Sequence, residues 1–381
     1  MRKHAQRGIP RRIKILHVFP NFRVGGSQMR LAMLVGALGT DIEHTVVSID
    51  GDHAARTLLP ANANITYVKA PTAGNFVSRI WSYSRYLRNA APDILITYNW
   101  GAMEWALANA FNRVPHIHME DGFGPEEIHR QIPRRVWARR ILLRHSTLVV
   151  PSATLGDIAS RIWKIKTERL KHIPNGIAPN APCKTAIAEL GLNLPDLPRI
   201  VWVGALRPEK NPLRLLRAFS QLRGEAVLLI LGSGPKLPDV IAEAERLSLL
   251  PCIRLLGHRI DARDIVMQCD ILALSSDTEQ MPFAILEAMA AGLAVASVDV
   301  GDVRQMVAAE NRPFIVPPCE NALGAALREL SADPALRARI GRANRLRLRE
   351  RYDARTMASR YADLFHTVAM ADECERPAHV Q

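Results

Sequence analysis

The sequence predicts an α/β protein of two domains, each with a doubly wound parallel sheet, and three observations support this class. The chain has 381 residues, which is long for a single hydrophobic core. Short apolar runs alternate with amphipathic helical patterns along nearly its whole length, as expected of parallel sheets covered by helices. The stretch 179–198 contains several prolines, interrupts this alternation and is typical of an interdomain connection.

The first predicted domain, residues 1–178, has a basic start and then alternates strands with helices. The expected strands are the apolar runs at 12–19, 44–49, 65–69, 93–98, 114–121 and 147–151. Helical periodicity occurs at 29–37, 77–89, 130–144 and 153–163. The last of these helices has Ser152 in the position of an N-cap. Strands that alternate with helices in this way favour a parallel sheet.

The second predicted domain, residues 199–350, continues the same alternation. Its expected strands are at 199–203, 226–231, 253–256, 271–274, 293–300 and 315–316. Its expected helices are at 262–269, 283–291 and 321–350, with a further one that starts at Pro212. A periodic helix at 352–368 is predicted to follow, and residues 369–381 are expected to form a loose polar tail.

The net charge of +13 lies entirely in the first half of the chain. Residues 1–178 carry a net charge of +13, whereas residues 179–381 carry equal numbers of basic and acidic side chains. This imbalance indicates that the first half faces an anionic partner: a membrane surface, an acidic acceptor or a nucleic acid. No nucleic-acid-binding motif accompanies the charge, so we expect no nucleic acid partner.

The predicted helix at 130–144 is the most basic element of that half. It carries six arginines and no acid, and Trp137 and aliphatic residues lie between the arginines. Basic amphipathic helices with an aromatic residue lie on anionic lipid, whereas the alternative is a solvated basic face over an ordinary apolar stripe. The segment Arg130–Arg144 is therefore a candidate contact with an anionic membrane surface.

The sequence also bears on cellular location. No apolar run reaches the roughly 18–20 residues that a membrane helix needs. The basic N-terminus lacks the pattern of a signal peptide. The five cysteines are scattered, and no pair has metal-ligand spacing. We therefore expect a reduced cytoplasmic protein, peripheral on the cytoplasmic face of the membrane if the basic helix binds lipid.

The stretch Ile271–Gly292 carries the most specific chemical pattern of the chain. A buried strand leads into a polar loop that contains Glu279. Pro282 then fits the first turn of a helix that contains Glu287 and ends at Gly292. Two carboxylates with this E-x7-E spacing can converge on one ligand above the carboxyl end of the strand. The helix N-terminus beside them suits a phosphate group.

A second chemical pattern follows the first strand of the second half. The loop after that strand contains Gly204, Arg207 and Lys210, and Asn211 and Pro212 then suit a helix start. Arginine binds phosphate oxygens as a fork, lysine binds them as a point charge, and the helix end adds N–H donors. We interpret the loop as a clamp for a diphosphate, the plainer alternative being a basic surface loop.

Two glycine turns follow predicted strands and can bring backbone N–H groups close to a ligand. They contain Gly25 and Gly26 in the first half, and Gly232 and Gly234 in the second. For the first of them, a plain tight turn is the alternative interpretation. Neither turn has the G-x-G-x-x-G fingerprint, so a nicotinamide dinucleotide site is not expected.

The strand at 114–121 places two histidines and several acids close together. Strand alternation puts His116, His118 and Glu120 on one face and Asp121 on the other. A metal site is one interpretation of this cluster. A His-x-His pattern on a strand is more often structural, so we predict no metal site.

The combination of E-x7-E with the helix sequence LEAMAAG resembles the retaining glycosyltransferases of the GT-B type, the group 1 or family 4-like enzymes. The resemblance implies two Rossmann-like domains that face each other across a cleft, with the C-terminal helix crossing back to the first domain. It implies transfer of a sugar from a UDP- or GDP-sugar to a hydroxyl of a saccharide or lipid-linked acceptor, in surface polysaccharide or glycolipid biosynthesis. The nucleotide sugar would be a substrate, and no cofactor or metal is implied.

The resemblance also assigns roles to residues in both halves. Glu287 would accept hydrogen bonds from the ribose hydroxyls, and Glu279 would hold a hydroxyl of the transferred sugar. The histidine that the family carries in the cleft aligns with Asp121, and His118 is the second candidate. The predicted catalytic residues are Asp121, His118, Glu279, Arg207 and Lys210. The predicted donor-binding residues are Gly25, Gly26, Gly204, Arg207, Lys210, Gly232, Gly234, His258, Glu279, Met281, Pro282, Phe283 and Glu287.

Three positions depart from the family pattern. Asp121 replaces the histidine, Ala205 occupies the slot of the phosphate-binding arginine, and Gln280 replaces the glycine that follows the first glutamate. Arg207, two residues beyond that slot, is expected to act with Lys210. Two alternatives to sugar transfer remain, a sugar-nucleotide epimerase of the same fold and a non-catalytic sugar-nucleotide-binding protein.

Overall fold

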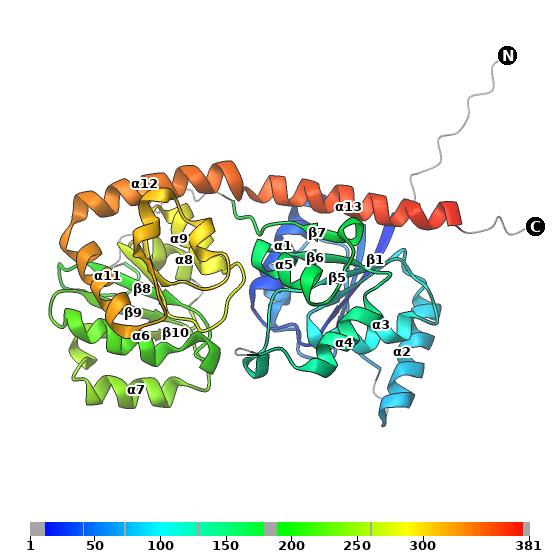
Figure 1. Cartoon of the computed structure of the whole chain (residues 1–381), viewed down its shortest axis with the longest axis horizontal. Coiled ribbons are helices and arrows are strands. Elements are labelled where there is room, and N and C mark those ends of the chain that lie inside the picture. Colours follow the sequence, from blue (N-terminus) through cyan, green and yellow to red (C-terminus); the bar gives the residue numbers. More distant parts are fainter. Residues whose placement is uncertain are drawn as a thin grey trace, which may run out of the picture.

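The computed structural model describes residues 12–40, 42–71, 74–127, 130–178, 189–259 and 261–375. It contains two parallel sheets, one in each half of the chain, and helices cover both faces of each sheet (Figure 1). The two domains predicted from the alternation of strands and helices are therefore present. Half of the predicted connection, residues 179–188, lies outside the described residues.

The N-terminal domain has a seven-stranded sheet in the order β3-β2-β1-β4-β5-β6-β7. Its strands are β1 (Ile13–Phe19), β2 (Ile42–Ser48), β3 (Ile65–Lys69), β4 (Ile94–Tyr98), β5 (His116–Met119), β6 (Thr147–Val150) and β7 (Leu170–His172). Its helices are α1 (Gly26–Leu38), α2 (Phe76–Ala90), α3 (Met103–Asn109), α4 (Pro133–Leu142) and α5 (Ala153–Arg161). Helix α1 packs on one face of the sheet, and α2 and α3 pack on the other.

The C-terminal domain repeats this plan with a six-stranded sheet in the order β10-β9-β8-β11-β12-β13. Its strands are β8 (Arg199–Val203), β9 (Val227–Leu231), β10 (Ile253–Gly257), β11 (Ile271–Leu274), β12 (Ala294–Val298) and β13 (Ile315–Val316). Its helices are α6 (Pro212–Phe219), α7 (Leu237–Arg246), α8 (Ala262–Met267), α9 (Phe283–Ala291), α10 (Val303–Met306), α11 (Glu320–Ala332) and α12 (Pro334–Arg351). Strands β9 and β12 are buried along their whole length, which explains why β9 is entirely apolar and β12 is apolar except for Ser297.

The strand orders fix where each sheet can bind a ligand. In each sheet the first three strands are added one after another towards one edge of the sheet. The fourth strand then lies on the other side of the first strand, and the later strands are added towards the opposite edge. The reversal lies between β1 and β4 in the first sheet and between β8 and β11 in the second. Doubly wound sheets bind ligands at such switch points, above the carboxyl ends of the strands.

The C-terminal helix α13 (Ala354–Glu375) returns to the N-terminal domain, as expected. Helix α12 packs against α9, and α13 then packs against α1 (Figure 1). The buried side chains of Met357, Tyr361 and Phe365 belong to the core of the N-terminal domain. Helix α13 continues to Glu375, so the tail predicted from residue 369 was placed too early; residues 376–381 lie outside the described residues.

Helices α3 and α7 and strand β7 were not among the elements predicted from the sequence. Helix α3 is short and has no side-chain N-cap, and β7 is a three-residue edge strand that is mostly exposed, so neither has a strong pattern. Helix α7 does have a strong pattern, because Val240 and Ala244 form a buried stripe below an exposed face. By contrast α9 has the predicted bounds, and Gly292 ends it in the left-handed conformation.

Candidate active site

The two domains meet where the carboxyl ends of their strands face each other. A Cβ atom added to Gly26, the first residue of α1, would lie 3.2 Å from the ring of Phe283 at the start of α9. A Cβ atom added to Gly122, after β5, would lie 3.1 Å from Cγ of Gln280. Segments at the carboxyl ends of the strands of both sheets therefore form part of the domain interface.

Polar contacts across this interface tie the two domains together. Asp302 of the C-terminal domain accepts hydrogen bonds from the backbone N–H groups of Ala153 and Thr154, and so binds the N-terminus of α5. Ser152 caps the same helix and donates its hydroxyl to Oε1 of Gln280 at 3.0 Å. Gln280, which replaces the family's glycine, thus contacts the N-terminal domain through its side chain.

The pair Lys210 and Glu279 lies at the switch point of the second sheet. Lys210 follows β8, Glu279 follows β11, and Nζ of the lysine donates to Oε1 of the glutamate at 2.5 Å. The hydroxyl of Ser276 donates to the same oxygen at 2.9 Å. Both side chains remain partly accessible, 28% for Lys210 and 11% for Glu279. A cation and a carboxylate predicted from separate motifs are therefore adjacent.

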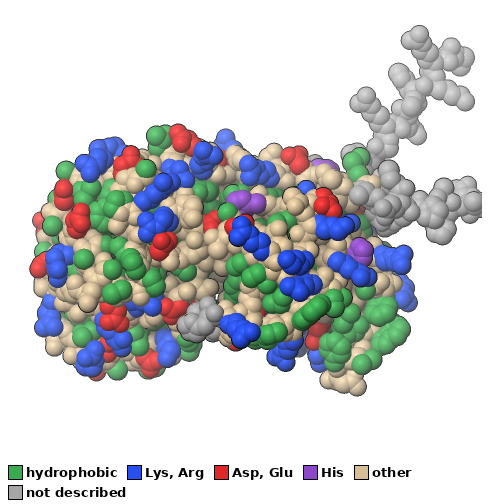
Figure 2. Space-filling view, viewed as in Figure 1, with side chains coloured by type: hydrophobic (Ala, Val, Ile, Leu, Met, Phe, Trp, Pro, Cys, Tyr) green, Lys and Arg blue, Asp and Glu red, His purple; other side chains and the backbone are tan. Residues whose placement is uncertain are grey.

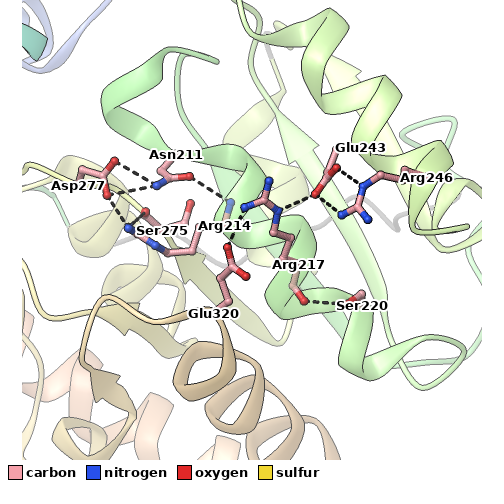
Figure 3. A network of polar contacts seen from close by, with 9 residues as sticks. All are labelled: Asn211, Arg214, Arg217, Ser220, Glu243, Arg246, Ser275, Asp277 and Glu320. Carbon is pink, nitrogen blue, oxygen red and sulfur yellow. Dashed lines mark hydrogen bonds and ion pairs between the residues drawn. The ribbon is translucent and has the colours of Figure 1, made fainter.

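A set of hydrogen bonds holds the two loops that carry this pair. Asn211 accepts a hydrogen bond from the backbone N–H of Arg214 as the N-cap of α6, and its amide donates to Asp277 (Figure 3). Arg214 donates to the carbonyl of Ser275 and forms an ion pair with Asp277. The hydroxyl of Ser275 donates in turn to the carbonyl of Lys210. These contacts fix the backbone on both sides of the lysine.

The predicted glycines of the C-terminal domain form one surface beside the pair. Gly204 donates to the carbonyl of Leu231, and Gly232 donates to the carbonyl of Gly257, so the loops after β8, β9 and β10 are joined. Gly232 has a φ of +143°, and a Cβ there would collide with the carbonyl of Gly204. A side chain at Gly234 would lie 2.5 Å from the carbonyl oxygen of Leu206. Close backbone packing thus requires glycine at both positions.

Arg207 and His258 have looser surroundings. Both side chains are exposed, and within the described residues the guanidinium of Arg207 forms neither a hydrogen bond nor an ion pair. Arg207 is available to a ligand but is not held in place, in contrast to Lys210. His258 follows β10 next to Gly257, and residue 260 lies outside the described residues.

Glu287 lies on α9, in a mostly buried position that faces α8. Burial raises the pKa of its carboxyl group to about 7, and the positive charge of Arg263 only partly opposes this effect. An ionised carboxylate is thus disfavoured until hydroxyl groups hydrogen-bond to it. Strongly shifted pKa values of this kind are common at functional sites, so Glu287 remains a candidate ligand contact.

Replacing Glu287 with glutamine is expected to stabilise the free protein and weaken nucleotide binding. The raised pKa means that the folded protein holds a proton that the unfolded chain releases, so stability falls as the pH rises from 4.5 to about 7. The free energy of unfolding of the Gln variant should therefore exceed that of the original protein by on the order of 2 kcal/mol above pH 7. At pH 4 the two free energies should be equal. Urea unfolding at both pH values, with nucleotide titrations beside it, measures the two effects; equal stability at pH 8 would contradict the expectation.

Asp121, the residue proposed to replace the family's histidine, is held by Arg30. The guanidinium of Arg30, on α1, donates to both carboxylate oxygens of Asp121, at 2.6 and 2.9 Å. The arginine is 2% exposed and the aspartate side chain 21%. Burial opposes the charge of Arg30, but Asp121 keeps the pKa of the guanidinium above its ordinary value. Asp121 therefore reaches the domain interface as one half of an ion pair.

This ion pair is connected to the other domain through Asn175. Arg30 also donates to Oδ1 of Asn175 at 3.0 Å, and the amide of Asn175 donates to the carbonyl of Met281 at 3.0 Å. Met281 lies between Glu279 and α9, in the loop that carries Glu279, the partner of Lys210. A continuous chain of hydrogen bonds thus links Asp121 to that loop.

His118 is placed in the interior of the sheet. Its side chain is 0% exposed, Nδ1 lies 2.7 Å from the hydroxyl of Thr97, and Nε2 lies 3.6 Å from Glu120. His116 contacts the same hydroxyl, so the two histidines share one face as strand alternation predicted. A ring enclosed in this way does not reach a ligand at the interface, which leaves Asp121 as the better placed of the two candidates.

Several residues of the site were not found from the sequence. Arg30, Asn175 and Asp302 form buried or partly buried contacts with partners more than 90 positions away. Asn99 holds the backbone N–H of Asp121 through its side chain and has a φ of +55°. The one available signal was Arg30, the only charged residue in the sequence of α1.

The predicted basic helix at 130–144 is shorter in the structure, where α4 spans Pro133–Leu142, and acids outside the helix pair with two of its arginines. Arg139 is fully buried, forms an ion pair with Glu120 and lies over the ring of Trp163. Arg135 is bound by Glu126 and Glu127. The prediction missed these partners because the acids precede the helix in sequence. Arg130, Arg134 and Arg144 remain exposed.

Comparison with known proteins gives a consistent result. Residues 190–347 match the family described as Glycosyl transferases group 1, and residues 24–181 match Glycosyltransferase Family 4. The alpha-maltose-1-phosphate synthase of Mycobacterium tuberculosis is 25% identical over 311 residues, which cover 73% of this chain and 80% of that protein. A GDP-mannose-dependent alpha-(1-6)-phosphatidylinositol monomannoside mannosyltransferase of Mycolicibacterium smegmatis is 28% identical over 213 residues, 51% of this chain and 56% of that protein.

Solved structures share the fold over nearly the whole chain. Anabaena HepE in complex with UDP and glucose superposes with a TM-score of 0.81 at 19% identity, covering 93% of this chain and 100% of that one. The sucrose-phosphate synthase of Thermosynechococcus elongatus superposes with a TM-score of 0.77 at 19% identity, covering 94% and 100%. Together with the two family matches, this shows that the chain belongs to the GT-B glycosyltransferases of group 1, family 4, and is a transferase.

Proposed function

We propose that this enzyme transfers a sugar from a UDP- or GDP-sugar to a hydroxyl group of a saccharide or lipid-linked acceptor, with retention of the anomeric configuration. The observation that carries the proposal is the pair Lys210–Glu279 at the switch point of the second sheet. A lysine offers a cation to a diphosphate, and the adjacent carboxylate accepts hydrogen bonds from sugar hydroxyls. The two groups thus match neighbouring parts of one donor.

The rest of the donor is assigned to residues around this pair. The N-terminus of α9 has no side-chain cap, so its first backbone N–H groups can bind phosphate oxygens. Arg207 adds a mobile positive charge on the solvent side, and Glu287 receives the ribose hydroxyls. With these charges around the leaving diphosphate the proposed reaction needs no metal ion.

The proposed reaction is an attack on the face from which the diphosphate leaves. The bond between the anomeric carbon and the phosphate oxygen breaks, the acceptor oxygen bonds to that carbon, and the acceptor proton passes to the diphosphate. Asp121 is unsuited to act as the base, because Arg30 engages both of its oxygens. We assign Asp121 to the binding of a sugar hydroxyl through its remaining lone pairs.

The acceptor is proposed to be an anionic or lipid-linked saccharide used in a surface polysaccharide or glycolipid. The excess positive charge of +13 in residues 1–178 supports this, since that domain lies opposite the donor loops. The mannosyltransferase relative is named for a phosphatidylinositol monomannoside, which is an anionic glycolipid. Among the described residues no helix is long and apolar enough to cross a membrane.

The proposal is tested by thermal unfolding with UDP, GDP and ADP and their sugar conjugates, with and without EDTA. A nucleotide at 100 times its Kd should add about 2.7 kcal/mol of stability. We expect one of the first two to stabilise the protein equally with and without EDTA. Stabilisation by none of them would overturn the donor assignment. Release of the free nucleotide without gain of sugar by any acceptor would instead favour an epimerase.

A further inference from the structure

An unusual number of large apolar side chains is exposed on one layer of the N-terminal domain. Helices α2, α3 and α4 are neighbours there, since α3 packs against both of the others. The exposed side chains are Phe76 (51%), Val77 (61%), Trp81 (62%), Phe111 (61%), Trp137 (60%) and Ile141 (56%). We call these six residues the aromatic face. No other tryptophan or phenylalanine of the described residues is exposed.

Helical spacing aligns these side chains with arginines. On α2 the outward residues Val77, Trp81, Arg85 and Arg88 follow one another at intervals of about one turn. On α4 and just beyond it, Arg134, Trp137, Ile141 and Arg144 have the same spacing. Each helix therefore presents a stripe in which two bulky apolar side chains lie next to exposed cations, at one end of the pair on α2 and at both ends on α4.

The exposed aromatic rings are ordered. Trp81 of α2 and Phe111, just after α3, stack with their ring centroids 5.9 Å apart and their planes at 17°. Trp137 carries the guanidinium of Arg140 over its ring at 5.2 Å. A shallow pocket of about 330 Å³ lies beside Trp137, lined by Arg130, Pro133 and Ile162 among others. The rings are held in place at the surface while most of their area remains in water.

The charge on these helices is mostly positive. Within residues 74–113 and 130–144 the only acids are Asp93 and Glu104. Glu104 is bound by Arg79 through two hydrogen bonds, and Asp93 accepts one from the backbone N–H of Lys14. Figure 2 shows hydrophobic and basic side chains gathered at the lower right, where Figure 1 places α2.

These features fit one kind of partner. We propose that the aromatic face docks onto an anionic lipid bilayer, with Trp81, Phe111 and Trp137 in the interfacial region and the arginines at the lipid phosphates. Tryptophan and phenylalanine flanked by cations are suited to that interface, and each basic residue near an anionic surface adds about 1 kcal/mol. A second copy of the chain fits poorly, because a symmetric contact would bring the arginines of both copies together.

This inference revises and extends the basic-helix prediction. The buried Arg139 and the paired Arg135 take no part, and the contact extends to α2 and Phe111, outside residues 130–144. The inference rests on the proposed function in one respect, the biological role of the contact: an enzyme bound to the membrane would be close to a lipid-linked acceptor. The nucleotide site and the bilayer contact can each be tested without the other.

The test is sedimentation of the full chain with vesicles of phosphatidylcholine alone or mixed with phosphatidylglycerol. We expect binding only to the mixed vesicles, a blue shift of tryptophan fluorescence on binding, and weakening at high salt. The double variant Trp81→Ser/Phe111→Ser should lower the vesicle partition coefficient about tenfold or more. The matched control is Leu346→Ser on α12, where an equally exposed side chain (58%) should leave binding unchanged.

A second pair of variants separates charge from insertion. Arg85→Glu/Arg144→Glu should lower binding to mixed vesicles, whereas Arg349→Glu on α12 should have little effect. All variants should keep the stabilisation by nucleotide that the original chain shows. The proposal is overturned if the original chain ignores anionic vesicles at low salt, or if Trp81→Ser/Phe111→Ser binds them unchanged. A concentration-dependent dimer that this double variant abolishes would assign the face to a second copy and likewise overturn it.

Discussion

Replacing Lys210 with alanine is expected to lower kcat/KM for the donor about 10²–10³-fold. The substitution removes the cation that we assign to the diphosphate and leaves Glu279 with Ser276 as its remaining side-chain partner. The donor KM should rise because the phosphates lose a contact, and kcat should fall because charge on the leaving group is less well stabilised. Initial rates over a range of donor concentrations separate the two effects.

The matched control for this substitution is Lys166→Ala. Lys166 is 75% exposed, and its nearest acid, Glu168, is 3.9 Å away, so its loss removes the same charge from the protein without changing the site. Lys210→Arg should recover part of the activity, because the charge returns with a different shape. An unchanged kcat/KM in Lys210→Ala, with Lys166→Ala also unchanged, would remove Lys210 from the donor site.

The second large effect is expected for Arg30→Met. This change leaves the carboxylate of Asp121 without its bidentate partner and removes a donor to Asn175. Removing one partner of a buried ion pair lowers the free energy of unfolding by about 3–5 kcal/mol. Because the Asp121 side chain is partly exposed, we expect a loss near the lower end of this range. Urea unfolding followed by tryptophan fluorescence measures the loss, since five of the six tryptophans lie in the N-terminal half.

A double-mutant cycle with Asp121→Asn decides whether the two residues act as a pair. The double variant Arg30→Met/Asp121→Asn should be more stable than the sum of the single losses predicts, by on the order of 2 kcal/mol. Asp121→Asn alone should also lower turnover, because the site loses a charged hydrogen-bond acceptor. Additive stability losses would show that the ion pair is not a unit, and full turnover in Asp121→Asn would remove it from the site.

The same pair shows why the role of Asp121 could not be derived from local patterns. Alignment on Gly122 placed Asp121 at a position that a histidine occupies in the family, which suggested a reactive group. The structure instead gives it an arginine 91 positions earlier in the chain. Because only packing brings α1 under the end of β5, no spacing rule in the sequence connects the two residues.

Gln280 illustrates a similar limit at the domain interface. In the sequence it is only a departure from the family pattern next to Glu279. In the structure its side chain bonds to Ser152, and Asp302 caps α5 from the other domain. The helix start at Ser152 was predictable from its own residues, whereas the partner across the interface was not.

The sequence by itself determined the elements that depend on local chemistry. Continuous apolar runs gave the buried strands, Asn211 with Pro212 gave the start of α6, and Gly292 gave the end of α9. Each of these follows from backbone preferences and burial within a few residues. The same locality made Lys210 and Glu279 recognisable, since each lies in the segment between a strand and the next α-helix.

Only the tertiary structure decided which of these groups meet and which are available. The strand order places Lys210 against Glu279, encloses His118, binds Arg139 to Glu120 and leaves Trp81 and Phe111 in water. All of these outcomes depend on contacts between residues far apart in the chain. Their free energy comes from packing two sheets and their helices together, which the pattern of any single segment does not contain.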